Sequence, residues 1–248
     1  MTSTGDRDTK TLSVVVPVFN EEAALDEFHR RLTATLADLP YGTRVLYVDD
    51  GSFDGSWSRL RAFAEADPGV AALRLSRNFG HQLALTAGLD AATGDAAVMM
   101  DSDLQMPPED IPRFVERWEA GAQIVNGRRT DAEDVGWVKR ATSRAFYRIV
   151  NRLSDVRIEP NAPDFRLLDR EVLDQLLRMR ESDRFLRGLV ATLGFRQETV
   201  EFQADSRYAG RSRYTLRKML GLALDGIVSF SIIPLRIAIG LGLLSAVL

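Results

Sequence analysis

The residues best suited to chemistry lie in the segment 100–109, MDSDLQMPPE. Asp101 and Asp103 follow an apolar run, so we expect both carboxylates to emerge where a strand ends. Gln105 adds a neutral oxygen within reach, and oxygen ligands of this kind suit Mg²⁺ or Mn²⁺ completed by substrate phosphates and water. A solvated acidic turn, with Asp110 capping the next helix, is the alternative interpretation of this one segment.

The composition restricts the kinds of site that the chain can form. It contains no cysteine, which excludes disulfides, thiolate metal sites and a cysteine nucleophile. The only histidines are His29 and His81, which excludes a His-rich zinc site. A metal must therefore rest mainly on oxygen ligands. The formal net charge of −3 gives no overall attraction to nucleic acid, and we expect no nucleic-acid partner.

Two more acidic turns follow apolar runs earlier in the chain. The segment 20–22, NEE, follows the run 12–18, and Asp49 and Asp50 follow the run 45–48. Strand ends of this kind meet at one edge of a parallel sheet, where carboxylates without a cation or ligand hydroxyls would repel one another. The arrangement favours a polyhydroxylated ligand with a metal over three coincidental turns.

The expected elements predict an open α/β sheet. Strands are expected at 12–18, 45–48, 70–75, 96–100, 165–168 and, at an edge of the sheet, 195–202. Helices are expected at 21–39, 79–91 and 135–153, together with one that ends at residue 66 and two short ones within 171–193. Strands that alternate with crossover helices place ligands at the carboxyl ends of the strands. No G-x-G-x-x-G follows the first strand and no Walker loop occurs, which excludes dinucleotide oxidoreductases and P-loop NTPases.

A basic segment followed by an apolar one suggests contact with a membrane. Five cations and no acid lie between Arg207 and Lys218, and mostly apolar residues follow to the last residue. We expect an interfacial amphipathic helix at 214–233 and, at 234–248, the start of a first transmembrane helix that is cut short of the roughly 20 residues a span needs. The basic segment would face anionic lipid headgroups on the cytoplasmic side. The alternative is a buried terminal helix of a soluble protein.

Seven motifs in order resemble those of the family 2 glycosyltransferases. They are VVVPVFNEE, VDDGSFDGS, SRNFGHQ, DSDLQMPPE, NGRR, DFRLLDR and RYAGRSRY. The chain is more closely similar to the polyprenyl-phosphate glycosyltransferases, a group that includes dolichol-phosphate mannose synthase and bacterial undecaprenyl-phosphate glucosyltransferases. The resemblance implies a flexible tail at 1–10 and a GT-A catalytic domain at 11–213, an open, mostly parallel sheet flanked by helices, before the interfacial and transmembrane segments.

The resemblance also implies a set of residues that bind the nucleotide sugar. Its members are Pro17, Phe19, Glu21, Tyr47, Asp49, Asp101, Ser102, Asp103, Arg129, Arg207 and Arg213. Within this set Glu21 would meet the ribose and Tyr47 and Asp49 the base, while Asp101, Asp103 and Gln105 would hold the metal. Arg213 stands where lysine is usual, so a bidentate fork replaces a point charge.

The implied catalytic residues are Asp164, Arg129 and Asp103. A polyprenyl monophosphate is largely ionised at neutral pH, because its second pKa is about 6, and it attacks with little help from a base. The enzyme must supply a metal for the leaving group, positioning and cations. Asp164 matches the position of the catalytic base, and orienting Arg166 is an equal alternative. For His81 the alternatives are an acceptor-side role and a structural one.

The prediction is an inverting glycosyltransferase, because a single displacement inverts the anomeric centre. It would move a sugar from a UDP-glucose-like or GDP-mannose-like donor to polyprenyl phosphate, at the cytoplasmic face of the inner (plasma) membrane, in the synthesis of cell-envelope glycans. An anionic membrane surface is an expected partner, and a homo-oligomer is left open. The alternatives are a soluble family 2 enzyme acting on a saccharide or protein, and a non-catalytic nucleotide-sugar binding module.

Overall fold

The computed structural model describes residues 10–130, 163–181, 185–203 and 245. The chain divides into two compact units. The first comprises residues 1–130, 162–180 and 195–210, and the second comprises 131–161, 181–194 and 211–248. Every described strand, and every described site residue discussed below, lies in the first unit.

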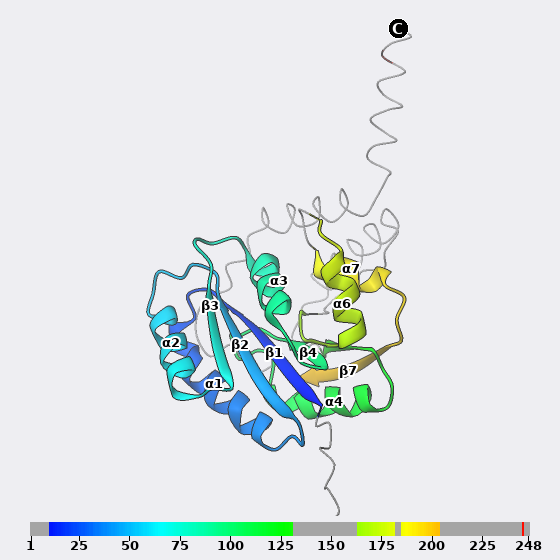
Figure 1. The fold of residues 1–248 in the computed structure, drawn as a ribbon, viewed down its shortest axis with the longest axis horizontal. Coiled ribbons are helices and arrows are strands. Elements are labelled where there is room, and N and C mark those ends of the chain that lie inside the picture. The colour runs from blue at the N-terminus through cyan, green and yellow to red at the C-terminus, as the bar shows by residue number, and fades with distance from the viewer. Residues whose placement is uncertain (1–9, 131–162, 182–184, 204–244, 246–248) are drawn as a thin grey trace, which may run out of the picture. The chain divides into compact units, whose positions relative to one another are not determined.

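The first unit is built on one mostly parallel sheet (Figure 1). Its strands among the described residues are β1 Thr11–Val18, β2 Gly42–Asp49, β3 Val70–Arg74, β4 Ala96–Met99, β5 Ile124–Thr130, β6 Arg166–Asp169 and β7 Gln197–Gln203. Their order is β3-β2-β1-β4-β6-β5-β7, in which β6 alone runs antiparallel to its neighbours. The prediction of an open sheet with the last strand at an edge is confirmed.

Helices cover both faces of this sheet (Figure 1). The elements are α1 Glu22–Ala37, α2 Ser56–Ala66, α3 His81–Ala91, the short 3₁₀ turn η1 Pro108–Asp110, α4 Ile111–Glu119 and α6 Arg170–Arg178; the second unit contributes α7 Leu186–Thr192. Helices α1, α2 and α4 pack in one apolar layer against the strands. Helices α3 and α6 pack on the other face.

Strand β1 is buried on both faces because it lies in the middle of the sheet. Its run of β-branched residues is typical of such a strand, with Val14 and Val16 on the α1 side. On the opposite side α3 approaches so closely that a Cβ atom on Gly88 would lie 2.3 Å from Cγ1 of Val15 and 3.0 Å from Cγ2 of Val48. The glycine therefore lets α3 rest directly on the sheet, which fixes the position of its first turn.

One alternative interpretation is wrong, and several predictions lie outside the described residues. The motif NGRR lies within β5, which continues to Thr130. Asp110 does not cap α4 with its side chain; its carboxylate instead accepts a 2.6 Å hydrogen bond from Arg113 Nη1. The segments 1–9, 135–153 and 214–233, and 234–248 except for Ser245, lie outside the described residues. Within the described ranges, no helix has the length and apolar character needed to cross a membrane.

Candidate active site

The turn after β1 is bonded to the turn after β2. The backbone N–H of Asn20 donates to Ser52 Oγ at 2.9 Å, and Asn20 Oδ1 accepts from the N–H of Phe53 at 3.0 Å. The N–H of Glu21 donates to Ser56 Oγ at 3.0 Å. These bonds hold Asn20 at a φ of 55°, in the left-handed region that asparagine tolerates better than most residues. Two motifs far apart in sequence thus form one ordered edge.

The carboxylate of Asp50 binds the loop that precedes α3. It accepts hydrogen bonds from the backbone N–H of Phe79 at 2.7 Å and of Gly80 at 2.9 Å, and from Asn78 Nδ2 at 2.9 Å. A Cβ atom on Gly51, whose φ is +71°, would lie 2.5 Å from the carbonyl carbon of Arg77. The two loops therefore lie directly against each other, and Asp50 determines where α3 begins.

The turn after β4 presents the two carboxylates of the D-x-D pattern. Ser102 Oγ donates to the carbonyl oxygen of Pro17 at 3.3 Å, which joins this turn to the end of β1. Asp103 Oδ1 accepts from the N–H of Gln105 at 3.1 Å, and Leu104 between them has a φ of 64°. The chain therefore turns sharply here, as two carboxylates one residue apart require if they are to share a cation.

A pocket of about 100 Å³ opens beside this turn. Its lining consists of Asp101, Asp103, Gln105, Met106, Arg129, Pro163 and Phe202. Arg129 Nη1 donates to Gln105 Oε1 at 3.2 Å, so the guanidinium group from β5 lies next to the amide from the turn after β4. The pocket brings together the predicted metal-binding residues and the predicted phosphate-binding arginine.

A buried carboxylate lies next to this turn. Asp164 is only 2% exposed and precedes β6, whose antiparallel direction brings its first residue to the edge where β4 ends. Gln82 Nε2 donates to Asp164 Oδ2 at 2.9 Å, and His81 Nε2 lies 3.2 Å from the same oxygen. His81 Nε2 is also 3.5 Å from Asp101 Oδ1. The first turn of α3 therefore links the predicted base to a predicted metal ligand.

Comparisons with known proteins agree with this geometry. Residues 13–177 match the model of glycosyl transferase family 2. The chain is 42% identical to a bactoprenol glucosyl transferase of Shigella phage SfX, with 95% of this chain and 77% of that protein covered. It is 43% identical to the uncharacterised glycosyltransferase YkcC of Bacillus subtilis, over 94% of this chain and 72% of that protein.

The chain belongs to glycosyltransferase family 2. The predicted family and enzyme class are therefore confirmed. Two solved structures share its GT-A-like fold. The mannosyltransferase PcManGT from Pyrobaculum calidifontis has a TM-score of 0.57 at 20% identity, with 82% of this chain and 59% of that chain covered. Glucosyl-3-phosphoglycerate synthase from Mycobacterium tuberculosis has a TM-score of 0.56 at 22% identity, with 89% of this chain and 79% of that chain covered.

The structure buries Tyr47, whose role at the base of the nucleotide stays a prediction. In this family 2 glycosyltransferase the Tyr47 side chain is fully buried, and its hydroxyl lies 3.0 Å from His29 Nδ1. Its ring packs edge-on against Phe28, and burial raises the pKa of the phenol. Because side chains alternate along β2, Tyr47 faces the same apolar layer as Val45 and points into the core, away from solvent.

Two further members of the predicted donor set have no more than a few per cent of their surface exposed. Asp49 is fully covered; its Oδ1 accepts from the N–H of Ser52 at 3.1 Å and its Oδ2 lies 3.1 Å from Arg74 Nε. Ser102 is 3% exposed, and its hydroxyl donates a hydrogen bond to the carbonyl oxygen of Pro17. In this structure these side chains shape the edge, and their roles at the nucleotide sugar stay predictions.

The other predicted donor residues fall into two groups. Pro17 is buried, and Phe19 and Glu21 are partly exposed at the end of β1, so that their roles at the nucleotide stay predictions. Arg207 and Arg213 lie outside the described residues.

One residue that contacts Asp164, and two that fix the loops, were not predicted from the sequence. Gln82 lies in the quoted motif SRNFGHQ, and its place beside His81 was the available signal. Asn20 and Asp50 also lie within quoted motifs, but their contacts join segments that are distant in sequence. Such contacts follow from the order of the strands and cannot be deduced from local patterns.

The donor atoms of the pocket fit a hard divalent cation. Asp101, Asp103 and Gln105 offer only oxygen, the ligand type that Mg²⁺ and Mn²⁺ prefer. Across the described residues, no group of three or more His, Asp and Glu side chains could hold a metal ion. This pair of carboxylates with one amide therefore suits a metal that completes its coordination with substrate phosphates and water.

Proposed function

We propose that this glycosyltransferase moves a sugar from a nucleoside diphosphate to a polyprenyl phosphate, with inversion at the anomeric carbon. The observation that carries the proposal is the convergence of Asp101, Asp103, Gln105 and Arg129 on one pocket beside the buried Asp164. Relatives 41–42% identical over 95% of the chain are named bactoprenol glucosyl transferases, which supports a polyprenyl phosphate acceptor. Glucose is accordingly the first sugar to test, with UDP as its carrier.

The donor half of the proposed site is the pocket. The Pyrobaculum and Mycobacterium structures are described with Mn²⁺ together with GDP-Man and UDP-glucose, respectively. Here Asp101, Asp103 and Gln105 would hold Mg²⁺ or Mn²⁺, which when bound neutralises charge on the departing nucleoside diphosphate. Arg129 would bind a phosphate oxygen through its guanidinium group, with its direction set by Gln105.

The acceptor half of the proposed site is Asp164 with His81 and Gln82. An acceptor phosphate must approach the anomeric carbon opposite the diphosphate, and a carboxylate at this position can receive its remaining proton. The hydrogen bond from Gln82 holds one carboxylate oxygen in place, so that the geometry needs no rearrangement before reaction. A purely orienting role for Asp164 is the competing assignment, and the two roles differ in the pH dependence of transfer.

The acceptor lipid would place the enzyme at the cytoplasmic face of the plasma membrane, where cell-envelope glycans begin. The domain boundaries at 11–213, 214–233 and 234–248, and the roles of Arg207 and Arg213, are part of this proposal. The basic segment 207–218 would contact anionic headgroups.

A paired binding and transfer experiment tests the proposed function. Thermal unfolding is followed with UDP, GDP, UDP-glucose, UDP-N-acetylglucosamine and GDP-mannose, each with Mn²⁺ and with EDTA. A ligand specific for the folded state at 100 times its Kd adds about 2.7 kcal/mol of stability. Transfer of labelled sugar from the stabilising donor to polyprenyl phosphate is then measured. We expect metal-dependent stabilisation by one nucleotide and a lipid product whose anomeric configuration is opposite to that of the donor.

Two outcomes would contradict the proposal. Metal-dependent binding without transfer to polyprenyl phosphate, but with transfer to a saccharide or protein, would favour the soluble type of family 2 enzyme. Donor binding that is unchanged in EDTA would contradict the proposed metal site.

A further inference from the structure

The large apolar side chains that are exposed lie together at one place. Among the described residues they are Phe53, 83% exposed, Phe79, 40% exposed, and Leu83, 38% exposed. Exposed apolar residues scattered singly over a surface need no explanation, whereas a cluster marks a site of interaction. We call these three residues the apolar edge.

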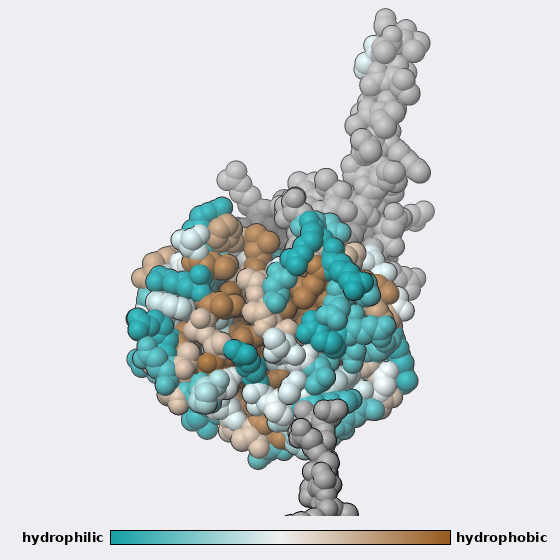
Figure 2. Space-filling view, viewed as in Figure 1, coloured by the Kyte–Doolittle hydropathy of each residue, from teal (hydrophilic) through white to brown (hydrophobic). Residues whose placement is uncertain are grey.

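The apolar edge is held rigidly by contacts described above. Phe53 is fixed through its backbone N–H by Asn20, and Phe79 through its backbone N–H by Asp50. The loops that carry them abut at Gly51 and Arg77. Figure 2 shows apolar residues gathered around the start of α3 and the loop before it. The apolar side chains are therefore exposed by an ordered structure, at a sheet edge whose shape is set by hydrogen bonds between loops.

A cation accompanies the apolar edge. The guanidinium of Arg77 lies over the ring of Phe79, 4.1 Å from its centre, and one of its nitrogens donates to the carbonyl oxygen of Asn78. Within the described residues Arg77 has no carboxylate partner, in contrast to Arg74, which pairs with Asp49. An exposed cation beside exposed aromatic and aliphatic side chains matches the boundary between lipid headgroups and acyl chains.

The apolar edge also adjoins the proposed acceptor site. Phe79 and Leu83 flank His81 and Gln82 in sequence, and the latter two contact the buried Asp164. The same short segment thus contacts Asp164 through one pair of residues and exposes its other pair to solvent. A lipid phosphate bound near Asp164 would bring the bilayer to this side of the molecule.

We infer that the apolar edge and Arg77 insert into the headgroup region of an anionic bilayer and so bring the acceptor site to the membrane surface. The inference rests on the proposed function for its acceptor, but it concerns a surface distinct from the basic segment 207–218. It commits to a lipid bilayer as the partner, because the isolated cation complements anionic headgroups.

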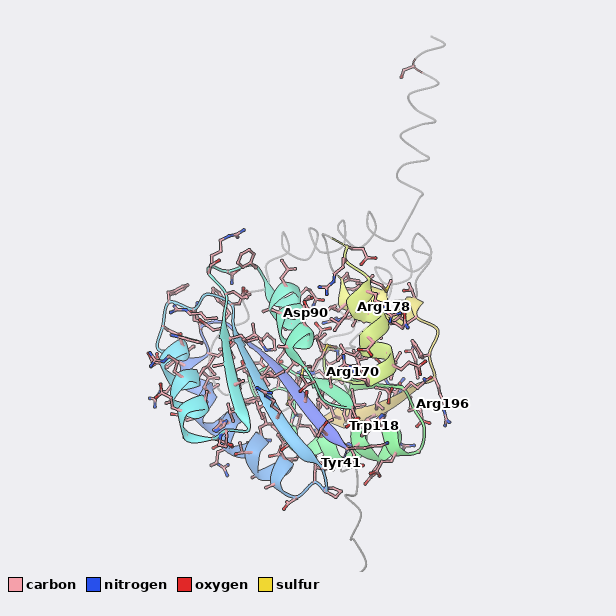
Figure 3. The ribbon with its side chains drawn as sticks, in the orientation of Figure 1. Tyr41, Asp90, Trp118, Arg170, Arg178 and Arg196 are labelled. Atoms are coloured by element: carbon pink, nitrogen blue, oxygen red, sulfur yellow. The ribbon has the colours of Figure 1, made fainter. Side chains whose placement is uncertain are left out.

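A site-specific fluorescence experiment on the full chain tests the inference. Since the chain has no cysteine, a single introduced thiol can carry an environment-sensitive dye without background. The dye is placed at Leu83→Cys and, as a matched control, at Arg196→Cys, an exposed position before β7 at the opposite edge of the sheet (Figure 3). Vesicles contain phosphatidylcholine alone or with phosphatidylglycerol. We expect a blue shift at Leu83→Cys with anionic vesicles and none at Arg196→Cys.

Charge variants sharpen the test. Arg77→Gln should weaken vesicle binding about threefold to tenfold, roughly the effect of one basic residue near an anionic surface. Arg61 lies on the exposed side of α2 and serves as the control. Arg61→Gln changes the net charge by the same amount and should not weaken vesicle binding. Equal shifts at both dyes, or no shift at Leu83→Cys while the protein still sediments with vesicles, would overturn the inference. A shift that needs only higher protein concentration would show contact with a second copy instead.

A transfer assay separates this inference from the proposed function. Phe79→Ser/Leu83→Ser should lose most transfer to long-chain polyprenyl phosphate in vesicles and keep transfer to a short, water-soluble prenyl phosphate. Failure of the unsubstituted enzyme with both acceptors would refute the proposed function. Normal transfer by the double variant in vesicles would refute the role of the apolar edge alone.

Discussion

The two edges of the sheet use carboxylates in opposite ways. At the amino-terminal edge, Asp95 accepts hydrogen bonds from the N–H of Thr11 at 2.7 Å and its hydroxyl at 2.9 Å, bonds that lower the pKa of this carboxyl group. Trp118 Nε1 donates to Asp169 Oδ2 at 2.7 Å, and the Tyr41 hydroxyl donates to Glu119; Figure 3 labels Tyr41 and Trp118. Each acid there stabilises a local junction.

At the carboxyl-terminal edge the acids gather instead. Asp101 and Asp164 both approach the same nitrogen, Nε2 of His81, and Asp103 lines the same pocket as Asp101. Bringing like charges together costs stability unless a ligand or cation offsets them. The comparison teaches that residue type alone does not identify a site. The acids described at the amino-terminal edge hold junctions of the fold, whereas the carboxyl-terminal edge combines structural acids, Asp49 and Asp50, with acids available for chemistry. The predictions below test this division.

Asp103→Asn should have the largest effect on activity. Loss of one carboxylate from the pair should lower transfer by about 10²–10³-fold, the range seen when one electrostatic group of an active site is removed. The melting temperature should fall little or rise, because one repelling charge is gone. Steady-state transfer assays with Mn²⁺ titration and thermal unfolding measure both. Unchanged Mn²⁺ dependence would place the metal elsewhere.

Asp164→Asn should lower transfer by about 10²-fold if this carboxylate receives a proton. The shape of the pH–rate profile distinguishes the two roles. Loss of a base removes the acidic limb of the profile, whereas loss of an orienting group lowers the whole profile evenly. Gln82→Leu removes the hydrogen bond to Asp164 but keeps its carboxylate, and should cost less than Asp164→Asn. A larger loss for Gln82→Leu would mean that it contacts substrate directly.

Trp118→Phe tests the amino-terminal edge. Removing the indole N–H leaves Asp169 Oδ2 without this donor, so the free energy of unfolding should fall by about 1–3 kcal/mol. Transfer activity of the folded enzyme should be unchanged, because the residue lies at the edge away from the pocket. Urea unfolding and initial rates at a temperature well below the transition give the two values. A large loss of activity without loss of stability would contradict a purely structural role for the amino-terminal edge.

Replacing His29 should have a smaller effect, which concerns the pH dependence of stability. Burial lowers its pKa in the folded protein, partly opposed by Asp67 and Asp26. Below about pH 6.5 the unfolded chain therefore binds a proton that the folded chain resists, and stability falls as the pH drops. His29→Gln should flatten this slope between about pH 7 and 5, measured by urea unfolding at several pH values. The carboxyl groups with lowered pKa values, Asp95 and Glu109, act at lower pH.

The fold could be predicted to a large extent because its signals are local. The β-branched runs, and those of the intervening helices that the structure describes, are confirmed to within a few residues. The bounds of helix α4, Ile111–Glu119, were not predicted; it carries a proline near its start and mixes charges with apolar residues.

The site was predictable only where strand order follows from alternation. The ends of β1, β2 and β4 are neighbours, as expected for successive turns of a parallel sheet. The contact between His81 and Asp164 depends instead on the antiparallel insertion of β6 between β4 and β5, which no local pattern encodes. The role of Tyr47 was taken from the family resemblance alone, whereas its position two residues from the buried Val45 indicates the core.

The hydrogen bonds that join the loops at the carboxyl-terminal edge have a thermodynamic consequence. Asn20, Ser52, Asp50 and their backbone partners lose their conformational freedom when the protein folds. Ordering the backbone of one residue costs about 1–2 kcal/mol. A loop that became ordered only when its ligand binds would weaken binding by that cost. A nucleotide that arrives at this edge meets a surface already ordered, so its affinity should respond weakly to temperature-dependent loop disorder and strongly to the loss of any one of these bonds.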